Sequence, residues 1–262
     1  MPTPNGQLSE TTHAPRKSRR LQWSLRAFAL LIVAFSAVFM LISSWQRTGQ
    51  LHAHVADQIQ RDRHVYIEWV HEDWQWVHPK PGVGVWRRAS TVSPWVRSVG
   101  AEPLFLRIDR VVINEASVNE LEPILEQLTR IPHLRDLSLY HCQSNEEQLA
   151  QWLAQTSVEE LSAEETQLGR GRLPFLNHPT LKHLHLGRTQ FSNPAIDDLP
   201  ISLEHLNLRR TRIADEGLDK FVRLTNLKQL DLSRTPTSGQ AIRGLRQKMP
   251  WCTIQWEPLR NP

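Results

Sequence analysis

The chain has 262 residues, with 31 Lys+Arg against 27 Asp+Glu, a formal net charge of +4 and a pI near 9.4. Residues 1–26 hold five basic groups and one acidic group, so the rest of the chain has 26 of each and is neutral. A nucleic-acid-binding domain needs a basic face, so the neutral body argues against that class. Two cysteines exclude a disulfide scaffold and a multi-cysteine zinc module.

The first elements are a polar basic tail over residues 1–20 and an apolar segment over 21–46. The segment is uncharged from Ala27 to Gln46, and a helix of that length spans about 30 Å, the thickness of the hydrocarbon core of a bilayer. Basic residues precede it, which predicts a cytoplasmic tail. We expect a single-pass signal-anchor in the cytoplasmic (inner) membrane, with the lipid bilayer as partner and the remaining chain outside.

A cleaved signal peptide is the alternative interpretation of the same segment. Its apolar region would be unusually long, and no small-x-small cleavage site follows it, because Ser43-Ser44 runs into Trp45.

Residues 47–98 form the predicted linker and Trp-rich N-terminal cap, with a helix passing into a strand along LHAHVADQIQRDRHVYIEWV. Half of the ten tryptophans lie here: Trp69, Trp74, Trp76, Trp86 and Trp95. A cap that covers the open edge of the next domain is the favoured interpretation, because the end of a stacked array exposes backbone and apolar side chains. An aromatic platform for a ligand is the alternative.

Residues 99–257 are repetitive. Five segments share the pattern L-x-x-L-x-L-x-x-T/C and start at Leu134, Val158, Leu181, Leu203 and Leu227. A degenerate copy, PLFLRIDRV, starts at Pro103, and a half-copy, WCTIQW, starts at Trp251. Each L-x-L core predicts a short strand, and the chain that follows predicts a return on the other face, with Asp215 as the N-cap of one return helix. Residues 258–262 are a tail.

The segment LEHLNLRRTRIADEGLDKF resembles the leucine-rich repeat of the F-box-like kind that carries a Thr/Cys ladder. The chain is also similar to membrane-anchored bacterial, planctomycete-type leucine-rich-repeat proteins that end in a motif like Met249-Pro250-Trp251-Cys252-Thr253-Ile254. Departures occur at Val158–Gly171 and Pro236–Gly239. The resemblance implies an α/β leucine-rich-repeat solenoid, with a parallel sheet on its concave face and helices or turns on its convex face, behind one transmembrane helix.

The repeat register predicts which side chains form rows across the concave face, about 4.8 Å apart. One row is Asp136, Glu160, His183, His205 and Gln229, and the strand exits carry His141, Glu165, Arg188, Arg210 and Arg234. The surface is expected to be acidic at one end and basic at the other. The candidate ligand-binding residues are Tyr140, His183, His185, His205, Arg188, Arg209, Arg210 and Arg234.

These features predict a non-catalytic protein that binds another protein or an envelope polymer through its concave face, without a cofactor or nucleic acid. The sequence has no G-x-S-x-G, H-E-x-x-H, phosphate-cradling loop or C-x-x-C motif, so we expect no enzyme. Two alternatives stay open. One is a metal-binding protein or metal-dependent enzyme that uses Glu160, His183 and His205. The other is an intracellular F-box-like adaptor, although a membrane span stands where F-box helices would precede the repeats.

Overall fold

The computed structural model describes residues 25–59, 65–69, 72–80, 83–90, 96, 98–99, 101, 107–131, 134–143 and 146–259. The chain divides into two compact units, Met1–Ser43 and Ser44–Pro262, which are treated separately below. Of the predicted disordered tail and the span that follows it, residues 1–24 lie outside the described part.

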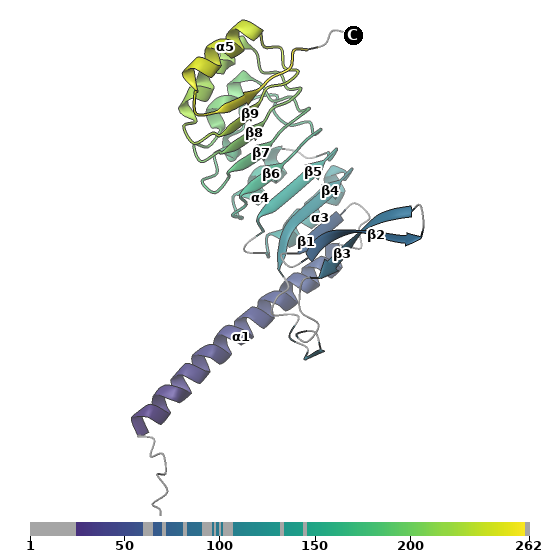
Figure 1. Cartoon of the computed structure of the whole chain (residues 1–262), viewed down its shortest axis with the longest axis vertical. Helices are drawn as coiled ribbons and strands as arrows, with labels where there is room; N and C mark the ends of the chain where they lie inside the picture. The colour runs from purple at the N-terminus through teal and green to yellow at the C-terminus, as the bar shows by residue number, and fades with distance from the viewer. Residues whose placement is uncertain are drawn as a thin grey trace, which may run out of the picture. The chain divides into compact units, whose positions relative to one another are not determined.

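A long helix, α1 (Leu25–Ile59), begins the described chain (Figure 1). Its stretch from Leu30 to Ile59 is long and apolar enough to cross a membrane, with a mean hydropathy of 1.6 in its most apolar window. Large apolar side chains there are exposed: Phe35, Phe39 and Met40 have 73%, 66% and 69% of their surface accessible. The helix is consistent with a signal anchor or a signal peptide.

The second unit begins with the end of α1, which packs onto the repeat sheet. Val55, Ala56 and Ile59 are buried in the common core. The buried imidazole of His52 accepts a hydrogen bond from the backbone N–H of Ile108 through Nδ1, at 2.9 Å. This contact joins the helix to the first repeat strand through a backbone donor that would otherwise need another partner.

Strand β1 (Val65–Trp69) follows, and it pairs antiparallel with β4 at the N-terminal edge of the main sheet. The chain then forms a separate antiparallel hairpin of β2 (Glu72–Lys80) and β3 (Val83–Ser90) (Figure 1). The tryptophans of the predicted cap therefore lie in β1 and in this hairpin, except Trp95, which is outside the described residues.

Seven parallel strands form the rest of the eight-stranded main sheet, in chain order. They are β4 (Ile108–Asn114), β5 (Asp136–Tyr140), β6 (Glu160–Ser162), β7 (His183–His185), β8 (His205–Asn207), β9 (Gln229–Asp231) and β10 (Thr253–Gln255). The expected parallel-sheet solenoid is thereby confirmed. From β5 to β10 the register is the predicted one, with the central leucine of each strand paired to that of the next and Leu230 of β9 paired to Ile254 of β10.

The predicted position of the first copy was wrong. Val111, and not Leu106, pairs with Leu137, so the copy runs Ile108-x-x-Val111-x-Ile113-x-x-Ala116 and does not start at Pro103. All four of these residues are buried. A β-branched residue fills a core position of a strand as well as leucine does, and the leucines of PLFL offered a closer match to the pattern than the true copy.

The convex side carries two α-helices, then 3₁₀ turns, then a last α-helix. They are α3 (Val118–Leu128), α4 (Glu146–Leu153), η2 (Pro174–Leu176), η3 (Asn193–Asp198), η4 (Asp215–Arg223) and α5 (Gly239–Lys248). Asp215 is not the N-cap that was predicted, since Ala214 holds that position. The Asp215 carboxylate instead accepts a hydrogen bond from the Ser238 N–H of the next unit, at 2.7 Å.

A ladder of buried polar residues follows the strands β5 to β9. Its members were predicted, and they are Cys142, Thr166, Thr189, Thr211 and Thr235. Each threonine hydroxyl donates to the backbone carbonyl three residues earlier in its own unit, at 2.7 Å. Only the Cys142 thiol reaches the preceding strand, at the Ile113 carbonyl. The threonine side chain is short, so its hydroxyl donates to a nearby backbone carbonyl of its own turn.

Candidate binding surface

The parallel register sets the predicted rows of side chains side by side. His183 lies between Glu160 of β6 and His205 of β8, and His185 is aligned with Ser162 and Asn207. The candidate residues His183, His185 and His205 are partly exposed, as is Tyr140, which is aligned with Asn114 on β4. The structure thus brings the three histidines together and leaves Tyr140 near the N-terminal end of the sheet.

One residue shortly after each of the strands β4 to β9 has a left-handed backbone. This exit ladder consists of Glu115, His141, Glu165, Arg188, Arg210 and Arg234, with φ between 53° and 60°. For an L-residue this conformation costs about 1–2 kcal/mol, and glycine adopts it without the steric cost. Every position of the exit ladder nevertheless carries a long or charged side chain. The residues are glutamate or histidine toward the N-terminal end of the sheet and arginine toward its C-terminal end.

Arginines gather at the C-terminal end of the exit ladder. Arg210, Arg212 and Arg234 line a groove of about 610 Å³ together with Thr211, Pro236 and Leu259. Arg188 forms an ion pair with Glu165, and Arg234 with Glu257 at 3.4 Å. Among the residues that the structure describes, Arg210 and Arg212 form no ion pair. The neighbouring Arg188 contributes most to lowering the pKa of Arg210, which marks a local excess of positive charge.

Carboxylates and histidines gather toward the other end of the sheet, around Glu160. Its carboxylate lies 3.3 Å from His183 Nδ1 and 3.6 Å from His185 Nε2. Beside it the buried Asp136 accepts hydrogen bonds from Arg110 and from the Ser138 hydroxyl. Burial is the largest cause that raises the pKa of Asp136, to about 6, with Glu160 adding to it and Arg110 opposing it. Burial lowers the pKa of His185.

These shifts predict a pH-dependent stability that Asp136→Asn should change. A raised pKa in the folded state stabilises the fold fully below the unfolded value of 3.8 and loses that contribution as the pH rises through about 6. The shift corresponds to about 3 kcal/mol. His185 acts oppositely, because its lowered pKa makes stability fall as the pH drops below its ordinary value. In urea unfolding between pH 4 and 8, Asp136→Asn should therefore lose more stability on acidification than the wild type. Parallel pH profiles would contradict the shift at Asp136.

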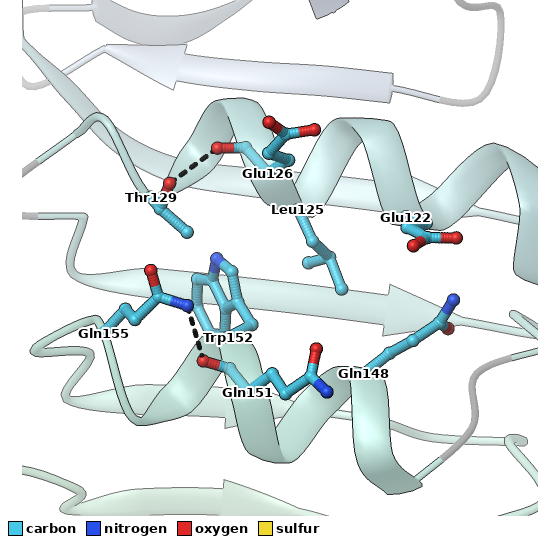
Figure 2. A pocket seen from close by; sticks show the side chains of 8 residues that line it. All are labelled: Glu122, Leu125, Glu126, Thr129, Gln148, Gln151, Trp152 and Gln155. Atoms are coloured by element: carbon cyan, nitrogen blue, oxygen red, sulfur yellow. Dashed lines mark hydrogen bonds between the residues drawn. The ribbon is translucent and has the colours of Figure 1, made fainter.

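A second groove lies between α3 and α4, on the convex side of the repeats (Figure 2). Leu125 and Trp152 line it, and the buried indole nitrogen of Trp152 has no hydrogen-bond partner among the described residues. Buried donors of this kind are commonly satisfied by an ordered water. Sequence reasoning missed this groove, because it is made by two convex returns whose spacing the repeat pattern leaves open.

Sequence reasoning also missed Glu204, which lies one residue before β8. A possible metal-ligand group consists of His183, Glu204 and His205, with one ligand atom of each residue within 4.8 Å of the other two. Glu160, the predicted third ligand, does not belong to this group. The signal that could have found it is the acidic residue directly before the second histidine in LEHLNL.

A comparison with family models agrees with the repeat fold. A family model described as Leucine Rich repeat matches residues 200–222. No curated protein matched the sequence. Similar solved structures include an internalin from Listeria monocytogenes, at 17% identity and a TM-score of 0.35, with 56% of this chain and 54% of the internalin covered. The chain thus spans about half the length of that internalin.

Two further structures are similar to the chain. One is the LRR ectodomain of the Arabidopsis thaliana receptor kinase SOBIR1, at 13% identity and a TM-score of 0.29, with 80% of this chain and 91% of the ectodomain covered. The other is a protein from Bacteroides fragilis, at 12% identity and a TM-score of 0.28, with 58% and 65% covered.

Proposed function

We propose that this leucine-rich-repeat protein is a non-catalytic binding scaffold, held in the cytoplasmic membrane by residues 21–46 with its N-terminal tail inside. In this proposal residues 47–98 are the linker and cap, and residues 99–257 present the concave face outside the cytoplasm. Proteins of this fold typically serve as scaffolds for protein binding. The contact residues are the C-terminal arginines together with the central histidines.

The exit ladder carries this proposal. At the six positions of the exit ladder the backbone has a conformation that glycine adopts without steric cost, yet none of the six residues is glycine. If these positions served the fold alone, glycine would be the favoured residue at each. Charged side chains retained at a steric cost, with Arg210 and Arg212 left exposed, are suited to contacts with a second molecule.

The partner that fits this surface is a protein with carboxylates on its contacting face. The groove along Arg210, Arg212 and Arg234 offers guanidinium groups, which bind carboxylates through two parallel hydrogen bonds. Leu259 and Pro236 add an apolar wall to the same groove. The acidic half around Glu160 and Glu164 sets the orientation, because it repels the acidic patch of the partner.

Replacing Arg210 and Arg234 by glycine tests the proposal with little risk to the fold, because glycine suits their backbone. Fluorescent poly-L-glutamate serves as the acidic probe for the solubilised full chain. We expect at least about tenfold weaker binding, which corresponds to about 1.4 kcal/mol, and no loss of thermal stability. The matched control is Arg243→Gln, which removes a positive charge from the exposed convex side. Glutamine is used there because Arg243 lies inside α5, where glycine would also weaken the helix.

The native partner is captured by crosslinking the solubilised full-length chain in its own membranes. The wild type and Arg243→Gln should capture the same protein, and the double glycine variant should not. Equal capture or equal probe affinity with the double variant would exclude the arginine groove as the contact surface.

A further inference from the structure

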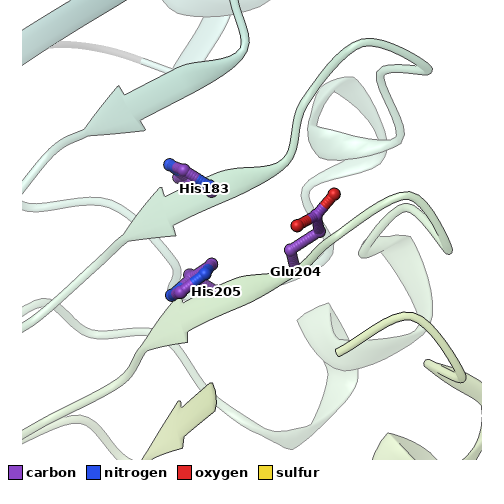
Figure 3. Close-up of side chains that lie close together, drawn as sticks. All are labelled: His183, Glu204 and His205. Atoms are coloured by element: carbon purple, nitrogen blue, oxygen red, sulfur yellow. The ribbon is translucent and has the colours of Figure 1, made fainter. Parts of the chain in front are cut away.

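Two histidines face each other across the middle of the sheet. His183 on β7 is paired in register with His205 on β8, and their ring centroids lie 4.6 Å apart in an edge-on arrangement. Glu204 directly precedes His205 and lies beside both rings (Figure 3). All three side chains are partly exposed, so a solute can reach them.

A hydrogen-bond acceptor orients each imidazole. Glu160 lies 3.3 Å from Nδ1 of His183, and the amide oxygen of Gln229 lies 3.2 Å from Nδ1 of His205. A carboxylate and an amide oxygen only accept hydrogen bonds, so Nδ1 of each neutral ring carries the proton. Nε2 of each ring then presents a lone pair. This is the arrangement by which proteins fix the tautomer of a metal-binding histidine.

Glu204 retains one oxygen for a ligand. Lys228 donates a hydrogen bond to its Oε2. The other oxygen, Oε1, is the available donor atom. Two imidazole nitrogens and one carboxylate oxygen form a donor set that suits zinc and other divalent transition metals, whereas magnesium and calcium favour oxygen alone.

We propose that His183, His205 and Glu204 bind one divalent transition metal ion, with zinc as the representative, and that Glu160 and Gln229 position the two histidines. One ring nitrogen of each histidine and one carboxylate oxygen of Glu204 lie within 4.8 Å of one another. Donors around a four-coordinate zinc lie about 3.3 Å apart at bond lengths of about 2.0–2.1 Å. Closing that gap takes small side-chain rotations at the surface, without a change in the strands.

Three protein ligands leave the fourth position of a tetrahedral ion for water or for a donor from another molecule. The site goes beyond the proposed partner contact, which includes the same histidines, because it needs no protein partner to bind its ion. It also differs from the ligand set that the sequence predicted, since Glu160 acts on His183 and Glu204 takes the place of the carboxylate ligand.

Zinc titration calorimetry of the solubilised full chain tests the site, with cobalt absorption as a second readout of the coordination geometry. We expect one zinc per chain and the visible spectrum of four-coordinate cobalt. Orienting partners of metal ligands contribute about 10–100-fold to affinity. We therefore expect a loss of about tenfold or more for Gln229→Leu, and a larger loss for His183→Gln, His205→Gln and Glu204→Gln. The exposed His141→Gln is the matched control and should bind zinc as the wild type does.

Thermal unfolding without metal separates a lost ligand from a lost fold, and the exposed Gln229 keeps the test decisive if a histidine variant does not fold. An absence of saturable zinc binding by the wild type would overturn the site. So would unchanged affinity in the folded ligand variants. A complete loss with Glu160→Gln beside an unchanged Glu204→Gln would overturn the ligand set and restore the row that the sequence predicted.

Discussion

Replacing Gly169 by alanine should lower the free energy of unfolding by about 3 kcal/mol. Gly169 has φ of +97°, a conformation that side chains rarely adopt, and an added Cβ would lie 2.5 Å from Cα and 2.6 Å from N of Phe191. These are backbone atoms of the next repeat, so no flexible side chain can yield. The Phe191 side chain is fully buried, which prevents the neighbouring unit from moving away.

Gly171→Ala is the matched control, two residues further along the same turn. An added Cβ there meets no atom within 4 Å, and its φ is not positive. The change should leave stability unaltered or raise it by up to about 1 kcal/mol, because alanine restricts the unfolded chain. Urea unfolding followed by tryptophan fluorescence measures both variants. A similar small effect of the two substitutions would show that the turn at Gly169 yields easily.

This turn lies in the unit that departs from the repeat pattern, and it shows what a pattern can and cannot predict. The five L-x-x-L-x-L copies predicted the register of β5–β9, because a parallel ladder with one buried face permits no slip between units. Gly169 was visible in the sequence only as a glycine. Its close contact with Phe191 arises from stacking, which brings together residues about one unit apart.

The first repeat was misplaced for a related reason. Its core positions are Ile108, Val111 and Ile113, which fill the same space as leucine but score less well against a leucine pattern. A positional feature of the backbone identifies the copy better. Glu115 has the same positive φ as the other exit-ladder residues and stands seven residues after Ile108, as His141 stands seven after Leu134.

The sequence predicted which residues of the candidate site share a row of the sheet, but it did not predict which side chains contact one another. The strand register alone places His183 beside His205, and it correctly predicts that Glu160 follows in the same row. Which carboxylate reaches the outer side of the rings depends on side-chain direction at the strand entry. Glu204 lies at this entry, beside Lys228. The alternation of side chains along a strand does not predict its direction, because β8 begins one residue later.

Arginine at two positions of α1 should release the chain from the membrane. Phe35 and Phe39 are exposed on the apolar part of the helix. A charged residue near the centre of a bilayer costs about 2.5–3.5 kcal/mol, so Phe35→Arg with Phe39→Arg should cost about 6 kcal/mol of insertion free energy. The wild type should stay in the membrane pellet after alkaline carbonate extraction, and the double variant should move to the soluble fraction.

Gln50→Arg is the matched control, because it adds a charge to an exposed position of the same helix beyond the predicted span. It should stay in the pellet. The mass of the mature chain then separates the two origins of membrane retention. An anchor leaves residues 21–46 in the protein, whereas a cleaved signal peptide removes them and yields a soluble wild type. Protease added to intact spheroplasts should degrade the repeats while the membrane is sealed. Protection of the repeats would place them inside the cell, where a ligand from the envelope cannot reach the arginine groove.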